Sequence, residues 1–111
     1  MSGADRHLDE LAATMGLLAG PVRHAATLPG VTDDLAEVLV RTGDELAAAH
    51  LRYRRAGRPE TTTGALVRTA GDSVIRLRAA EVLVRDPATA LVLRDLRDQL
   101  DAHRAAVLKS S

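Results

Sequence analysis

Apolar side chains recur along this chain at alternating steps of three and four residues, in four separate segments. An α-helix turns once every 3.6 residues, so this spacing places them in one narrow stripe of a helix. Such stripes bury themselves against one another in bundles and coiled coils, so the pattern predicts an all-α fold, an antiparallel up-down-up-down four-helix bundle with coiled-coil-like packing. The stripes are Leu8, Leu11, Met15 and Leu18; Leu35, Leu39, Thr42, Leu46, Ala49 and Tyr53; Val67, Ala70, Val74, Leu77, Glu81 and Val84; and Leu93, Leu96, Leu100, His103 and Val107.

Glycine, proline and short polar residues between the stripes predict where the helices begin and end. Gly20 suits a left-handed cap and Pro21 cannot continue the hydrogen-bond ladder, so we expect the first helix to stop at Ala19. Thr32 is a candidate N-cap, and Asp86-Pro87 reads as an N-cap followed by a first helical residue. The expected helices are 4–19, a short turn or helix at 22–28, and then 33–56, 60–85 and 87–108, within one domain spanning 1–111 whose residues 1–3 and 109–111 are disordered.

The composition fits a folded globular protein built from small aliphatic residues. Of 111 residues 46% are hydrophobic and 27% charged, the net charge is zero, and Tyr53 is the only aromatic residue. The chain has no cysteine, which excludes disulfides and thiolate metal sites. Lys109 is the only lysine among fifteen basic residues, which indicates a bacterial gene of high GC content. The apolar run 11–22 is too short to span a bilayer, so we expect a cytoplasmic protein that does not contact membranes.

The third and fourth expected helices carry apolar residues outside their stripes. A helix on the surface of a bundle needs only one apolar face of about 100°. The excess indicates a central position in the bundle, an interface with a second copy of the chain, or extra coverage required by helices of unequal length. The residues concerned are Leu66, Ile75, Val82 and Leu83 in the third helix and Leu91 and Val92 in the fourth.

Charge is distributed unevenly along the chain. Residues 1–51 contain eight acidic and three basic residues, a net charge of −5, and residues 52–85 contain eight basic and three acidic residues, a net charge of +5. The two halves can pair within one molecule, or the polarity can orient a partner. The candidate interaction residues are Arg52, Arg54, Arg55, Arg58 and Arg76, together with Ile75, Val82 and Leu83.

No catalytic motif is present in the sequence. It has no glycine-rich phosphate loop, no HExxH, no GxSxG and no Glu-x-x-His pair, so we predict that the protein is not an enzyme and needs no cofactor. One metal hypothesis follows from the expected antiparallel pairing, which brings three histidines to one level of the bundle. If they converge they could bind zinc, nickel or copper, with Glu45, Glu10 or Asp72 as a fourth ligand. The histidines are His7, His50 and His103.

In size and helicity the chain is similar to the small WXG-type proteins that specialised secretion systems export from GC-rich Gram-positive bacteria. It departs from their pattern, because it contains no tryptophan, its turn Ala56-Gly57-Arg58 lacks Trp-x-Gly, and the terminal Tyr-x-x-x-Asp/Glu signal is missing. The resemblance therefore supplies only an alternative function, that of an exported helical partner protein.

The sequence thus favours a non-enzymatic protein that acts through protein–protein interaction, with a second copy of itself or with another helical protein. Export as a WXG-like partner is one alternative. Binding of nucleic acid through the basic region Arg52–Arg85 is the other, and the neutral net charge and the absence of aromatic platforms for stacking bases weigh against it.

Overall fold

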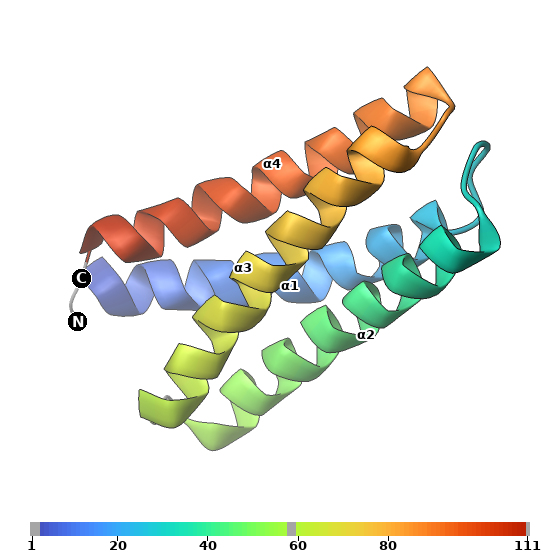
Figure 1. The fold of residues 1–111 in the computed structure, drawn as a ribbon. Coiled ribbons are helices and arrows are strands. Elements are labelled where there is room, and N and C mark those ends of the chain that lie inside the picture. Colours follow the sequence, from blue (N-terminus) through green and yellow to red (C-terminus); the bar gives the residue numbers. More distant parts are fainter. Residues whose placement is uncertain (1–2, 58–59, 111) are drawn as a thin grey trace.

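The structure, a computed structural model, describes residues 3–57 and 60–110 and consists there of four helices of nearly equal length (Figure 1). They contain 23, 24, 24 and 24 residues. The ends predicted to be disordered lie partly outside the described residues, and the last helix continues through Lys109. The helices are α1 (Gly3–Ala25), α2 (Asp33–Ala56), α3 (Glu60–Leu83) and α4 (Pro87–Ser110).

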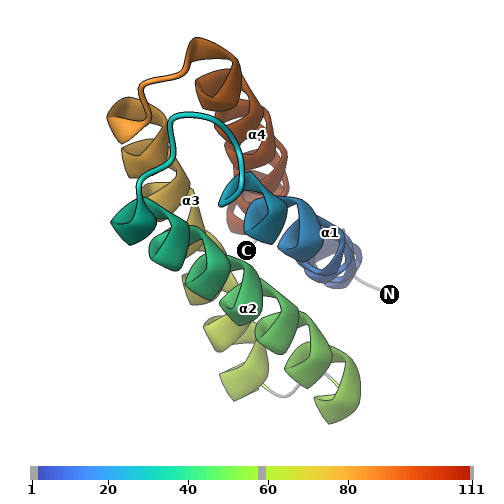
Figure 2. The same cartoon turned by 90° about the vertical axis from the view of Figure 1, so that its right-hand side faces the viewer.

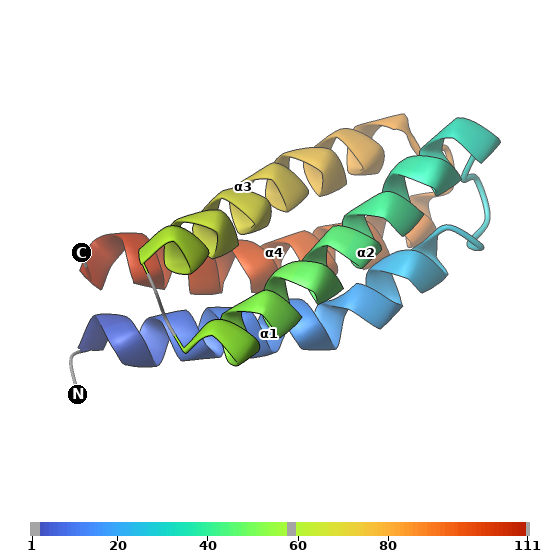
Figure 3. The same cartoon turned by 90° about the horizontal axis from the view of Figure 1, so that it is seen from below.

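The helices form an up-down-up-down bundle, which confirms the predicted fold. Each helix packs against the next one in the chain, and α4 closes the ring against α1, whereas α1 and α3 barely touch. Figures 1 and 2 place both chain ends at one end of the bundle and the α1–α2 loop and the α3–α4 turn at the other. Figure 3, seen from below, shows α2 and α3 side by side in front of α4.

Local chemistry explains the boundaries of α2 and α4, as predicted. The Thr32 side chain accepts a hydrogen bond of 3.3 Å from the Leu35 amide, and Gly57 ends α2 in the left-handed conformation. The Asp86 carboxylate accepts a hydrogen bond of 2.9 Å from the Thr89 amide, and Pro87 follows as the first residue of α4. These capping groups satisfy amides that have no partner within the helix.

The predicted end of the first helix at Ala19 is wrong, because α1 continues through Pro21 to Ala25. The additional turns bury Val22 and Ala25 completely. An interior proline costs a helix about 3 kcal/mol, and complete burial of a valine returns roughly 1.5–3 kcal/mol. Packing therefore offsets the local helix-breaking signal, and no separate short helix forms at 22–28.

The core contains the predicted stripes, with one change of phase in α3. All six stripe residues of α2 are buried. In α3, Val67 and Glu81 are only partly buried, whereas Leu66, predicted to lie outside the stripe, is 1% exposed. The buried residues again follow steps of four and three, at Leu66, Ala70, Ser73, Leu77, Ala80 and, just after the end of α3, Val84. Val74 of the predicted stripe is buried as well.

Candidate interaction surface

The three histidines predicted to share one layer do not form a metal site. His50 Nδ1 lies 2.7 Å from the carbonyl oxygen of Ala12, and because a carbonyl can only accept, this nitrogen carries the proton and is occupied. His7 Nδ1 has no hydrogen-bond partner and lies 3.7 Å from the Glu10 carboxylate. Within residues 3–57 and 60–110, no three His, Cys, Asp or Glu side chains are placed to hold a metal ion. Convergence fails because His50 turns toward the backbone of α1.

The polar residues in the stripes have local partners rather than catalytic ones. The Thr42 hydroxyl donates a hydrogen bond of 2.7 Å to the carbonyl oxygen of Val38 in its own helix. Glu81 accepts a hydrogen bond of 3.0 Å from Arg97 of α4. It points toward the neighbouring helix, where two half-buried charges neutralise each other.

The basic residues predicted to bind a partner divide into two groups. Arg52, Arg54 and Arg55 are exposed at the end of α2, and none forms an ion pair with another described residue. Arg76 is instead paired with Glu45 of α2, and Arg58 lies outside the described residues. The first group leaves positive charge available to an acidic partner.

Tyr53 cannot serve as a stacking platform beside these arginines. Its side chain is only 5% exposed, and its hydroxyl donates a hydrogen bond of 2.7 Å to Asp9 of α1. Because Tyr53 is the one aromatic residue of the chain, the basic end of α2 offers charge but no ring on which a nucleic-acid base could stack.

The predicted apolar interaction residues all lie on the outer surface of α3. Ile75, Val82 and Leu83 are 66, 80 and 67% exposed. Ile75 and Val82, seven residues apart, lie on the side of α3 opposite the buried stripe, and Leu83, one residue further on, lies on the side toward α2. α3 occupies a corner of the bundle and packs mainly against α2 and α4, and its outer side carries these exposed apolar residues beside the exposed Arg68, Asp72 and Arg78.

Intramolecular pairing accounts for only part of the charge polarity. Asp44 is bound by Arg23 of α1 at 2.6 Å, and Glu45 by Arg76 of α3. Asp34 and Glu37, nearer the start of α2, are exposed and form no ion pair with any residue that the structure describes. The acidic beginning and the basic end of α2 thus both remain open to a partner.

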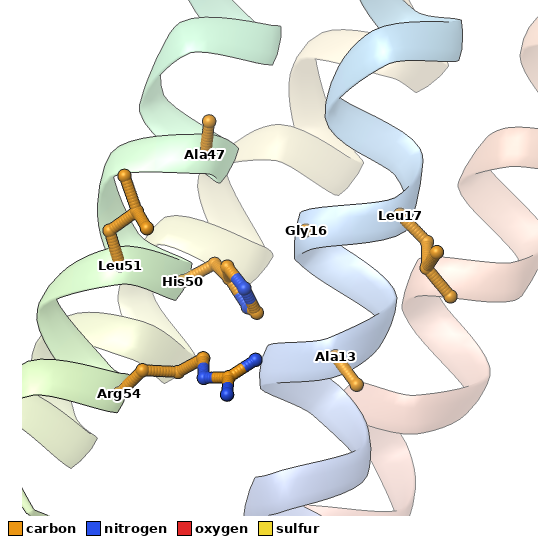
Figure 4. A pocket seen from close by; sticks show the side chains of 7 residues that line it. All are labelled: Ala13, Gly16, Leu17, Ala47, His50, Leu51 and Arg54. Atoms are coloured by element: carbon orange, nitrogen blue, oxygen red, sulfur yellow. The ribbon is translucent and has the colours of Figure 1, made fainter.

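A second apolar surface, between α1 and α2, was not expected from the sequence (Figure 4). It is a shallow groove of about 520 Å³ flanked by Leu17, which is 77% exposed, and Leu51, which is 47% exposed. Small side chains form its floor because the two helices approach closely there. The sequence does contain a signal for this groove, because Leu17 and Leu51 are large apolar residues outside the stripes of their helices. The groove is lined by Ala13, Gly16, Leu17, Ala47, His50, Leu51 and Arg54.

Comparisons with models of protein families, with curated proteins and with solved structures give no match for this chain. In the described part of the chain, no helix combines the length and the apolar character that crossing a membrane requires.

Proposed function

We propose that the protein acts by binding other proteins through the outer surface of its helices, as a homodimer or with a helical partner, and not by catalysing a reaction. The observation that carries this proposal is the outer apolar surface of α3, formed by Ile75, Val82 and Leu83. Exposed large aliphatic side chains that lie close together favour association, because burying their surface contributes about 25 cal/mol per Å².

Two of the three explanations for this surface conflict with the geometry. A central position of α3 would bury Ile75 and Val82, yet both are exposed. Unequal helix lengths would leave one helix projecting, yet the lengths differ by a single residue. Both observations support an interface with a second protein.

The test is a comparison of association between the wild-type chain and a variant with Ile75, Val82 and Leu83 replaced by glutamine. Light scattering and sedimentation measure self-association, and chemical cross-linking in cells of the native host measures a heterologous complex. We expect the wild type to form a complex by one of these routes and the variant to lose it while retaining its helical circular dichroism. Equal association of the two proteins would contradict the proposal.

A matched control replaces three exposed residues on the other helices, Val40, Leu51 and Leu108, by glutamine. This variant also removes three exposed aliphatic side chains but leaves α3 intact. It should associate as the wild type does. That result would distinguish association through the surface of α3 from nonspecific hydrophobic association.

A further inference from the structure

Seven residues of α2 form one stripe on the outer face of the helix. They follow one another at steps of three and four, which places them on one face. A groove of about 480 Å³ is lined by four of them together with Glu45 and with Thr69 of α3, so the stripe borders the junction of the two helices. We call this set the α2 charge stripe, and its members are Asp34, Glu37, Arg41, Asp44, Ala48, Arg52 and Arg55.

The sign of the charge changes along this stripe, from negative at its beginning to positive at its end. Asp34 and Glu37 stand at its beginning and Arg52 and Arg55 at its end, all four are exposed, and none forms an ion pair with a described residue. The helix dipole favours this order only within the first and last turns. It explains Asp34 and Arg55, but Glu37 and Arg52 lie one turn further in.

The two ends cannot neutralise each other within one molecule. At a rise of 1.5 Å per residue, Glu37 and Arg52 are roughly 22 Å apart along the helix and Asp34 and Arg55 roughly 32 Å. Salt at about 0.15 M screens charges beyond roughly 8 Å. Neither end of the stripe therefore has its complementary charge within reach on α2 itself.

We infer that a second copy of this chain packs antiparallel on the face shared by α2 and α3, so that the α2 charge stripes of the two copies lie side by side. This inference rests on the proposed function and names its partner. A two-fold axis passing between Asp44 and Glu45 brings Asp34 opposite Arg55 of the second copy and Glu37 opposite Arg52 of the second copy. A two-fold contact makes each pairing twice, so four ion pairs form.

The middle of the stripe is compatible with this contact. Asp44 and Glu45 lie near their own symmetry mates, but each is already neutralised by an arginine of its own molecule, Arg23 and Arg76. Ala48, one turn from the axis, has a small side chain that allows two helices to approach closely.

The same contact would cover part of the apolar surface of α3. Thr69, Arg76 and Leu83 follow one another at steps of seven and so lie in one line along α3. Thr69 lines the groove beside α2, and Arg76 reaches Glu45 of α2. Leu83 therefore lies on the α2 side, adjacent to the charge stripe, and Ile75 borders the same line.

The test is a charge swap followed by sedimentation equilibrium on the full chain. Glu37→Arg and Arg52→Glu each place like charges opposite one another twice per dimer, and each should weaken dimerisation about tenfold. The double variant, with both changes, restores opposite charges in the reverse sense and should recover most of the loss. Only antiparallel pairing of these two positions predicts that recovery.

The control is Arg94→Glu, which changes the net charge as Arg52→Glu does but at an exposed position of α4. It should leave the dissociation constant within about twofold of the wild-type value, and dimerisation of the wild type should weaken between about 25 mM and 1 M salt. A double variant no better than the single ones would overturn the inference, and so would a wild-type chain that is monomeric at low salt or that binds a DNA duplex instead.

These outcomes are separable from failure of the proposed function. A dimer that is insensitive to all charge changes but is lost on replacing Ile75, Val82 and Leu83 would overturn the charge-stripe contact and leave association through α3 standing. A chain that associates with nothing in either experiment would overturn both.

Discussion

The hydroxyl of Thr89, at the start of α4, donates a hydrogen bond of 2.7 Å to the carbonyl oxygen of Pro29, in the loop between α1 and α2. The two residues are 60 positions apart in the sequence, and Thr89 is 2% exposed. Beside them Gly30 has a φ of +80°, and a Cβ at that position would lie 2.7 Å from the amide nitrogen of Asp86. One hydrogen bond and one side-chain-free residue thus join the two connections at this end of the bundle.

Replacing Thr89 by valine should destabilise the protein by about 1–3 kcal/mol. Valine has nearly the same shape, so the change removes the hydroxyl and leaves the packing in place. Urea denaturation followed by far-UV circular dichroism measures the effect. The control is Thr27→Val, since the exposed Thr27 hydroxyl bonds only to His24 in its own turn; this variant should stay within about 0.5 kcal/mol of the wild type. Equal losses in the two variants would show that the link between the loops contributes nothing.

Gly43 lies where α1 and α2 approach closely, and its replacement by alanine should cost about 1–3 kcal/mol. A Cβ at this position would lie 2.8 Å from the carbonyl oxygen of Ala19 and 2.5 Å from the side chain of Arg23, so the helices would have to move apart. Gly64 is also helical and has no atom within 4 Å of the corresponding position. Gly64→Ala should therefore stabilise the protein, by about 0.5–1 kcal/mol, because alanine is the better helix former. If α1 and α2 approach closely at Gly43, the two variants should shift the melting temperature in opposite directions.

The ion pair between Glu81 and Arg97 should contribute a measurable coupling energy. The two side chains are 23 and 16% exposed, so solvent screens the pair only partly. Arg97 Nε lies 3.0 Å from Glu81 Oε2. A double-mutant cycle of Glu81→Gln and Arg97→Gln should give a coupling of about 1–2 kcal/mol. The same cycle on Arg6 and Glu10, a 3.9 Å pair with side chains 67 and 48% exposed, should give less than about 0.5 kcal/mol. Similar couplings would mean that burial of the α3–α4 pair is not what strengthens it.

These contacts show which parts of the structure the sequence can predict. The caps at Thr32 and Asp86 depend on residues three positions away, so local sequence was sufficient to predict them. The α3 stripe was harder, because Leu66 and Val67 begin two equally regular alternations that share Ala70, Leu77 and Val84. The choice between them depends on the direction of α2 and α4, which no local pattern contains.

The candidate surface was predictable to the same extent. The exposure of Ile75, Val82 and Leu83 followed from their positions outside the stripe. The pairing of Arg76 with Glu45 did not, because it depends on the level at which α2 and α3 face each other. For the same reason the orientation of His50 toward Ala12, which removes it from the hypothetical metal layer, could not be predicted from spacing.

Pro21 shows how packing can override a local helix-breaking signal. It also supports the prediction that a substitution inside α1 stabilises the protein. It lies inside α1, where it donates no hydrogen bond to the carbonyl oxygen of Leu17. Because the helix already continues through this position, Pro21→Ala should restore that bond and stabilise the protein by about 1–2 kcal/mol. This value allows for the roughly 0.4–1 kcal/mol that proline contributes by restricting the unfolded chain.

The control for this prediction is the same substitution at Pro87, the first residue of α4. A first helical residue has no partner for its amide within the helix, so proline costs nothing there and its fixed φ suits the helix. Pro87→Ala should therefore destabilise the protein, by up to about 1 kcal/mol, through the unfolded state alone. Opposite signs for the two variants in urea denaturation would show that α1 is held across Pro21 by the burial of Val22 and Ala25. Destabilisation by both would mean instead that the proline fits α1 without strain.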